Sequence, residues 1–228
     1  MKATNMRDIA YFPIDYFAFY PLMLLAALLW PHAALATPAE DVVRLQQQWE
    51  QIRYKTPVDA QEQALERLTA EAQKAASQPP PNADVLIWYA IIESSYAGAK
   101  GGLGALSHAK NARKSLEQAL GVNPDALSGS AYTSLGSLYY QVPGWPIGFG
   151  DEKKAQEYLR KGLAVNPDGI DPNYFYGDYL YRKGDYAEAT RYLNKALQAA
   201  PRPGRKIADE GRRSEVEQLL EKIAAKRK

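Results

Sequence analysis

Apolar residues recur three and four positions apart through much of the chain, a spacing that places them on one face of a helix. Three such stretches, 115–125, 157–168 and 191–201, end in a turn that carries a proline. A further helical stretch lies upstream of the last two, at 130–141 and 171–184. No segment of useful length alternates apolar and polar residues as a strand does. The pattern predicts an all-α chain built from paired helices.

The helix pairs recur at a regular interval. Pro167 and Pro201 lie 34 residues apart, and Pro124 and Pro167 lie 43 apart, nine more. Gly136 and Gly177 occupy matching positions in the first helix of two pairs, where a small residue lets two helices approach closely. The interval indicates an array of helical repeats, in which each pair packs against the next.

The residues at fixed positions in these pairs resemble the tetratricopeptide repeat, whose signature is W-x2-L-G-x2-Y, then A-x3-F, then P. In the last unit the matching residues are Gly177, Leu180, Ala189, Leu193, Ala196 and Pro201. In the middle unit they are Tyr132, Leu135, Gly136, Tyr139, Ala155, Leu159, Gly162 and Pro167. A weaker unit before it has Leu86, Tyr89, Ala90, Ala112, Leu116, Ala119 and Pro124. The resemblance implies a TPR-type α-α superhelix of about three repeats, at about 83–124, 129–167 and 170–201.

Further helices are expected at both ends of the array. Residues 58–80 look like the second helix of a degenerate unit. Helical spacing also precedes the array, at Val42, Leu45, Trp49 and Ile52. It returns after the array, over 204–226, at Val216, Leu219, Leu220 and Ile223. We expect these outer helices to cap an open solenoid, with the whole repeat domain covering 37–228.

The N-terminal segment predicts export. Residues 22–30 read LMLLAALLW, and the small-x-small sequence Ala34-Leu35-Ala36 follows. A short apolar run before such a site is typical of a secretory signal peptide. We expect a signal peptide over 1–36, cleavage after Ala36, and a periplasmic product with no stable membrane insertion. The alternative is an uncleaved membrane anchor over 16–36, because about 20 apolar residues can span a bilayer.

The composition and the absence of known motifs exclude most kinds of catalytic site. The 228 residues include no Cys and two His, which excludes Cys nucleophiles and Cys-ligated metals and leaves too few ligands for a multi-His metal site. No nucleophile-elbow, P-loop or H-E-x-x-H motif is present. We expect His108 to be a lone helix-surface residue, and Asp209 and Glu210 to be solvated helix charges. A net charge of +2 gives no bulk attraction to nucleic acid. The chain is therefore expected to be no enzyme and to have no metal, cofactor or nucleic-acid partner.

The resemblance also implies where a ligand would bind, because the first helix of each tetratricopeptide unit lines the concave face. Carried over to this chain, the groove positions of the middle and last units are Thr133, Ser137, Tyr140, Gln141, Tyr174, Asp178, Tyr181 and Arg182. Tyrosine supplies contact area and a hydroxyl at low entropic cost, which suits contacts with a peptide or a small ligand.

An inserted segment lies between the two helices of the middle unit. Within 143–150 it carries Trp145, Ile147 and Phe149, three apolar residues on what would otherwise be an exposed loop. Either the segment folds back and its rings pack on a neighbouring helix, or it forms a lip over the groove and touches the ligand. If the segment forms a lip over the groove, Trp145 is one of the candidate binding residues.

These expectations together favour an exported, non-catalytic scaffold that binds a protein or peptide in its concave groove. A small-molecule ligand is possible. The alternative function is that of a periplasmic solute-binding accessory of a transporter, because the array is distantly similar to the repeat-bearing T component of TRAP transporters. Those components are usually lipoproteins, and this chain lacks the Cys that they require.

Overall fold

The computed structural model describes residues 36–226, so the predicted signal peptide or anchor lies outside the described residues apart from Ala36. Over this range the chain consists of helices, turns and one isolated bridge between Gly144 and Gly150. The helices are α2 Pro38–Lys55, α3 Val58–Ala76, α4 Ala83–Lys100, α5 Ala105–Val122, α6 Ala126–Gln141, α7 Glu152–Val165, α8 Ile170–Arg182, α9 Tyr186–Leu197 and α10 Lys206–Lys226. The expected all-α fold is confirmed.

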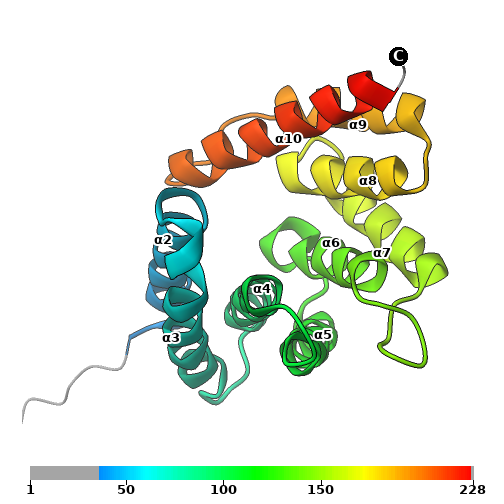
Figure 1. The fold of residues 1–228 in the computed structure, drawn as a ribbon. Helices are drawn as coiled ribbons and strands as arrows, with labels where there is room; N and C mark the ends of the chain where they lie inside the picture. Colours follow the sequence, from blue (N-terminus) through cyan, green and yellow to red (C-terminus); the bar gives the residue numbers. More distant parts are fainter. Residues whose placement is uncertain (1–35, 227–228) are drawn as a thin grey trace, which may run out of the picture. The chain divides into compact units, whose positions relative to one another are not determined.

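The helices pack as successive hairpins. α4 contacts α5, α6 contacts α7, and α8 contacts α9, as expected for the three repeats, and α2 and α3 form a fourth pair (Figure 1). The first helices of neighbouring pairs also touch, since α2 contacts α4, α4 contacts α6, and α6 contacts α8. The α-α superhelix expected from the repeat pattern is therefore present.

Small residues set the spacing within two of the hairpins. A Cβ placed on Gly136 would lie 2.6 Å from Leu159 Cγ, and one on Gly177 would lie 2.8 Å from Leu193 Cγ. Both distances are below ordinary van der Waals contact, so the two helices of each hairpin approach more closely than a side chain there allows. The sequence prediction that these positions are packing sites agrees with this geometry.

Local signals explain where several helices begin. Thr37 caps α2 in a capping box with Glu40, and the Asp151 carboxylate accepts hydrogen bonds from the Lys153 and Lys154 amides at the start of α7. The first residues of α6 differ from a regular helix, because Leu127, Ser128 and Gly129 have φ values of 47°, 53° and 74°. A left-handed turn therefore precedes the right-handed part of α6, which starts near the predicted residue 130.

The buried apolar residues form two clusters. The smaller cluster joins α2, α3 and one face of α4, and the larger one joins the other face of α4 to all the later hairpins. α10 contributes to both, with Val216, Leu219 and Ile223 in the larger cluster and Ala208 in the smaller one. This helix does not simply extend the array.

The C-terminal helix closes the array into a ring. α10 contacts α8 and α9 along part of its length and reaches back to contact α2, the first helix described (Figure 1). The sequence prediction was a capping helix at the end of an open solenoid. What the pattern could not show is that this helix crosses the concave side and meets the other end of the array.

Within residues 36–226 no helix combines the length and the apolar character that a membrane crossing requires.

Candidate functional site

The ring surrounds a cavity of about 1330 Å³. Its walls come from the first helices of the four hairpins, α2, α4, α6 and α8, together with α10 and the start of α5. None of the residues that line it belongs to α3, α7 or α9. Concave surfaces of this kind are where repeat arrays bind their ligands. The geometry therefore makes the interior of the ring the candidate binding site.

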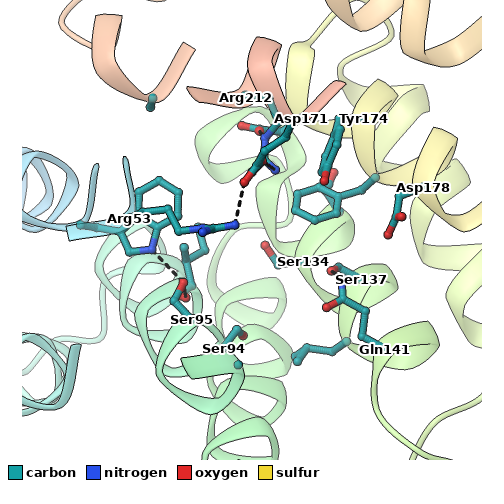
Figure 2. A pocket seen from close by; sticks show the side chains of 18 of the residues that line it. Arg53, Ser94, Ser95, Ser134, Ser137, Gln141, Asp171, Tyr174, Asp178 and Arg212 are labelled. Atoms are coloured by element: carbon teal, nitrogen blue, oxygen red, sulfur yellow. Dashed lines mark hydrogen bonds and ion pairs between the residues drawn. The ribbon is translucent and has the colours of Figure 1, made fainter. Parts of the chain in front are cut away.

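One wall of the cavity is rich in hydroxyl groups. Ser94 and Ser95 of α4 and Ser134 and Ser137 of α6 face the same space, with Gln141 at the end of α6 (Figure 2). The Ser94 and Ser95 hydroxyls donate to carbonyl oxygens one turn earlier in α4. Ser95 Oγ also accepts from Trp49 Nε1 at 2.8 Å, whereas the Ser94 oxygen can still accept a hydrogen bond from a ligand. This wall can bind polar groups of a ligand without presenting a formal charge.

The opposite wall is aromatic and charged. Tyr174 and Phe175 of α8 line the cavity, and the Arg212 guanidinium of α10 lies over both rings, 4.3 Å and 4.8 Å from their centroids. Arg212 Nε also donates to Asp171 Oδ1 at 2.8 Å, and Arg202 donates to Asp171 Oδ2 at 2.6 Å. These contacts fix α10 against α8, so they shape the cavity as well as lining it.

The pKa values of this wall follow from burial and from the arginines. Burial by itself would raise the pKa of the Asp171 carboxyl, but Arg212 and Arg202 lower it to about 2. Burial raises the pKa of Tyr174 to about 12, against the opposing effect of Arg212. At neutral pH the site therefore holds an ionised Asp171, its two guanidinium partners and a neutral phenol.

Most of the predicted groove residues line the cavity. They are Thr133, Ser137, Gln141, Tyr174, Asp178 and Arg182. Thr133 is the most buried of these, because it also packs against Gly162 of α7 at the inner contact of its own hairpin. The predicted face of α6 and α8 is therefore the one that lines the cavity.

Tyr140 and Tyr181, predicted for the same groove, are not among the lining residues. The Tyr140 hydroxyl donates to Asp178 Oδ2 at 2.8 Å between α6 and α8, and burial together with Asp178 raises its pKa well above the usual value. Tyr181 packs at 5.7 Å against the ring of Tyr186, the first residue of α9. Tyr140 therefore joins two neighbouring repeats, whereas Tyr181 joins the two helices of the last repeat.

The segment with Trp145 combines features of both alternatives. Phe149 folds back, with the Arg113 guanidinium 4.5 Å from its centroid and Tyr139 edge-on at 5.7 Å. Ile147 lines the cavity, whereas Trp145 is 89% exposed and does not line it. Part of the segment is therefore structural and part forms the rim of the cavity.

Sequence reasoning missed the contribution of α2 and α10 to the site. Trp49, Arg53 and Tyr54 enter the cavity wall from α2, and Arg212 and Glu215 enter it from α10. Figure 2 labels Arg53 and Arg212 of these. The periodicity of these two helices indicates only that each has an apolar face. One signal was available, because Gly211 interrupts an otherwise helix-favouring segment, and such a glycine often marks a close contact.

Two expectations about charged residues were wrong. His108 is not a lone surface residue, because its Nδ1 lies 2.6 Å from Oε2 of the buried Glu93 and its ring packs on Tyr96. Asp209 is not solvated, because it is 3% exposed and accepts hydrogen bonds from the Arg202 backbone and side chain. In both cases the partner lies on another element, which helix periodicity alone cannot reveal.

The part of the chain that the structure describes contains no cluster of three or more His, Asp or Glu residues arranged to hold a metal ion.

The comparison with known families agrees with the helix pairing. The family model described as "Tetratricopeptide repeat" matches residues 171–203, which span α8, α9 and the turn that follows them. No curated protein matches the chain, and the expected similarity to the TRAP transporter T component is not shown. The hairpins before α8 repeat the same packing of first helix on second. The matched segment, residues 171–203, is therefore a tetratricopeptide repeat, and together with the earlier hairpins it forms a TPR-type α-α superhelix. Tetratricopeptide repeats generally act as scaffolds for protein interactions.

Proposed function

We propose that this protein is an exported, non-catalytic scaffold whose ring-shaped repeat domain binds a short segment of a protein partner in its cavity. The observation that carries the proposal is the position of α10. By closing the concave face against α2, α10 turns an open groove into a bounded space of about 1330 Å³. A space of this size can hold a short peptide segment but not a folded domain.

The chemistry of the lining supports a peptide. A hydroxyl-rich wall can accept hydrogen bonds from backbone amides, and the Tyr174 and Phe175 rings offer apolar contact area to side chains. The ionic groups of the opposite wall are already paired with one another, so an uncharged backbone meets few unpaired charges. A peptide can then gain affinity from many small contacts without displacing an ion pair.

Export is supported by the junction between the predicted signal peptide and the fold. The predicted cleavage site follows Ala36, and the next residue, Thr37, is the N-cap of α2, with its backbone nitrogen donating to Glu40 at 2.8 Å. Cleavage there would leave the first helix and its capping box complete. A mature chain of residues 37–228 would then contain every helix that the structure describes.

The proposal is tested by capture on the immobilised mature chain from an extract of the cells that produce it. Two variants accompany the wild type: Tyr174→Ala in the cavity, and Tyr192→Ala on α9, which does not line it. We expect a protein to be retained by the wild type and by Tyr192→Ala and lost with Tyr174→Ala. Equal retention by all three folded proteins would contradict the cavity as the binding site.

The bounded volume also favours a second candidate, a small solute held inside the ring. Native mass spectrometry of the purified protein separates the two candidates. A bound solute adds a discrete mass that is released on denaturation, whereas a peptide-binding scaffold purified alone shows the mass of the polypeptide. A discrete adduct that Tyr174→Ala abolishes would favour the solute.

A further inference from the structure

The contact that closes the ring differs from the other joints between its helices. We call this contact the seam and define it as residues 49–54 of α2 against residues 205–215, which cover the start of α10 and the residue before it. Only Ala208 of α10 belongs to the buried apolar cluster on the α2 side. By contrast, Val216, Leu219 and Ile223 anchor the rest of the helix in the larger cluster on the α8 and α9 side. Apolar burial therefore holds α10 firmly to the last repeat and weakly to α2.

Most of the contacts that hold the seam closed are polar. Arg53 pairs with Glu215 at 2.6 Å, with side chains 44% and 17% exposed. Arg205 reaches Glu50 at 3.4 Å in a largely buried pair, with side chains 14% and 6% exposed, and its guanidinium lies 4.9 Å from the centre of the Trp88 ring. An ion pair that reaches solvent, as Arg53–Glu215 does, contributes little net stability and is weakened by salt, whereas a buried pair is screened much less. Through Arg53–Glu215 the seam is more sensitive to ionic strength than the apolar joints between the hairpins.

One glycine is required for the seam to close. A Cβ on Gly211 would lie 2.5 Å from Tyr54 Cγ and closer still to other atoms of that ring. Glycine in the interior of a helix is unfavourable relative to alanine, so its presence in α10 needs a reason. The reason here is close approach, because any side chain at this position would push α10 away from α2.

One helix, α4, connects the two buried clusters and touches the seam through Trp88. Val85, Trp88 and Ile92 of α4 pack into the cluster with α2 and α3, whereas Leu86 and Ile87 of the same helix pack into the larger cluster. In a repeat array each unit contacts mainly its neighbours. A small rotation at one joint therefore moves the units on either side of it as rigid bodies. α4 is therefore the place about which the α2–α3 hairpin can turn.

We infer that the seam is a gate: the ring opens between α2 and α10 by a rotation of the α2–α3 hairpin about α4, and it closes through the Arg53–Glu215 and Arg205–Glu50 pairs and the contact of Gly211 with Tyr54. Opening exposes the cavity along one side. A peptide segment in the middle of a longer chain can then enter without threading its end through the ring. The gate is a property of the ring itself and holds whether or not the proposed ligand is correct.

The absence of Cys makes the gate directly measurable. Gln47→Cys with Glu210→Cys places one spin label on each side of the seam, at exposed positions. Glu117→Cys with Lys153→Cys labels α5 and α7, across an apolar joint between neighbouring hairpins, as the matched control. Distance distributions are measured by pulsed electron paramagnetic resonance on the mature chain at about 0.05 M and about 0.5 M NaCl, a range over which screening of surface charges changes strongly.

The gate predicts a distance across the seam that gains a longer component in high salt, while the control distance stays the same. Introducing Gly211→Ala should produce the longer component already in low salt, because the new methyl group meets Tyr54. Gly121→Ala, where a Cβ meets no atom within 4 Å, should leave both distances unchanged. A seam distance that neither salt nor Gly211→Ala alters would overturn the gate, as would an equal change in the control pair.

Discussion

At the scale of single residues, close approach of helices depends on glycines that look alike in the sequence. Gly136 and Gly177 face leucine side chains of the partner helix, whereas a Cβ on Gly121 meets nothing within 4 Å. The repeat signature predicted the first two, because the small-residue position is part of the pattern. It could not predict Gly211, which has its partner, Tyr54, at the opposite end of the chain. Local pattern thus identifies packing within a repeat but not packing between distant segments.

The two kinds of glycine should respond in opposite ways to alanine. Gly136→Ala should lower the free energy of unfolding by about 1–3 kcal/mol, because the methyl group overpacks the contact with Leu159. Gly121→Ala should raise it by about 0.5–1 kcal/mol through helix propensity alone. Urea unfolding followed by circular dichroism measures both. Stabilisation by both substitutions would show that the spacing of α6 and α7 does not depend on Gly136.

At the scale of elements, helix type and order could be predicted, and helix partners could not. The helical spacing of apolar residues and the proline-bearing turns predicted the paired helices of the three repeats. The repeat pattern predicted which face of α6 and α8 lines the cavity. The final helix was also predicted over about 204–226, close to the observed α10. Its role in the ring depends on ion pairs such as Arg212–Asp171 and Arg53–Glu215, which join residues 41 and 162 positions apart. Apolar periodicity carries no information about such pairs.

The Asp171 contact should make stability depend on acid pH. The pKa of Asp171 is about 2 in the folded protein against a usual value of 3.8. The stabilisation is therefore fully present above about pH 4 and is lost as the pH falls through about 2, to a total of no more than about 2 kcal/mol. In urea unfolding between pH 5 and pH 2.5, Asp171→Asn should lose less stability than the wild type. Parallel pH profiles of the two proteins would mean that Asp171 is not held by the arginines.

At the scale of the whole molecule, the tetratricopeptide array forms a ring with an interior. Four hairpins curve so that their first helices face inward, and α10 joins the last hairpin to the first (Figure 1). The sequence predicted the array and its concave face but not the closure. Closure changes the functional expectation, because a bounded cavity takes a smaller ligand than an open groove does.

The N-terminal prediction also belongs to this scale. If the protein is exported through cleavage after Ala36, intact-mass analysis of the natural protein should give the mass of residues 37–228, with Thr37 at its start. A chain recovered from the membrane fraction with residues 16–36 still present would favour the anchor instead.

The central claim, that the interior of the ring binds the partner, is tested most directly by filling the cavity. Ser134 of α6 lines the cavity, and Ser134→Trp places an indole in its interior (Figure 2). Asn194→Trp adds the same bulk at an exposed position of α9, away from the cavity, as the matched control. Isothermal titration of the captured partner should show binding weakened by at least about 2 kcal/mol for Ser134→Trp and unchanged for Asn194→Trp. A folded Ser134→Trp protein that binds as tightly as the wild type would contradict the account.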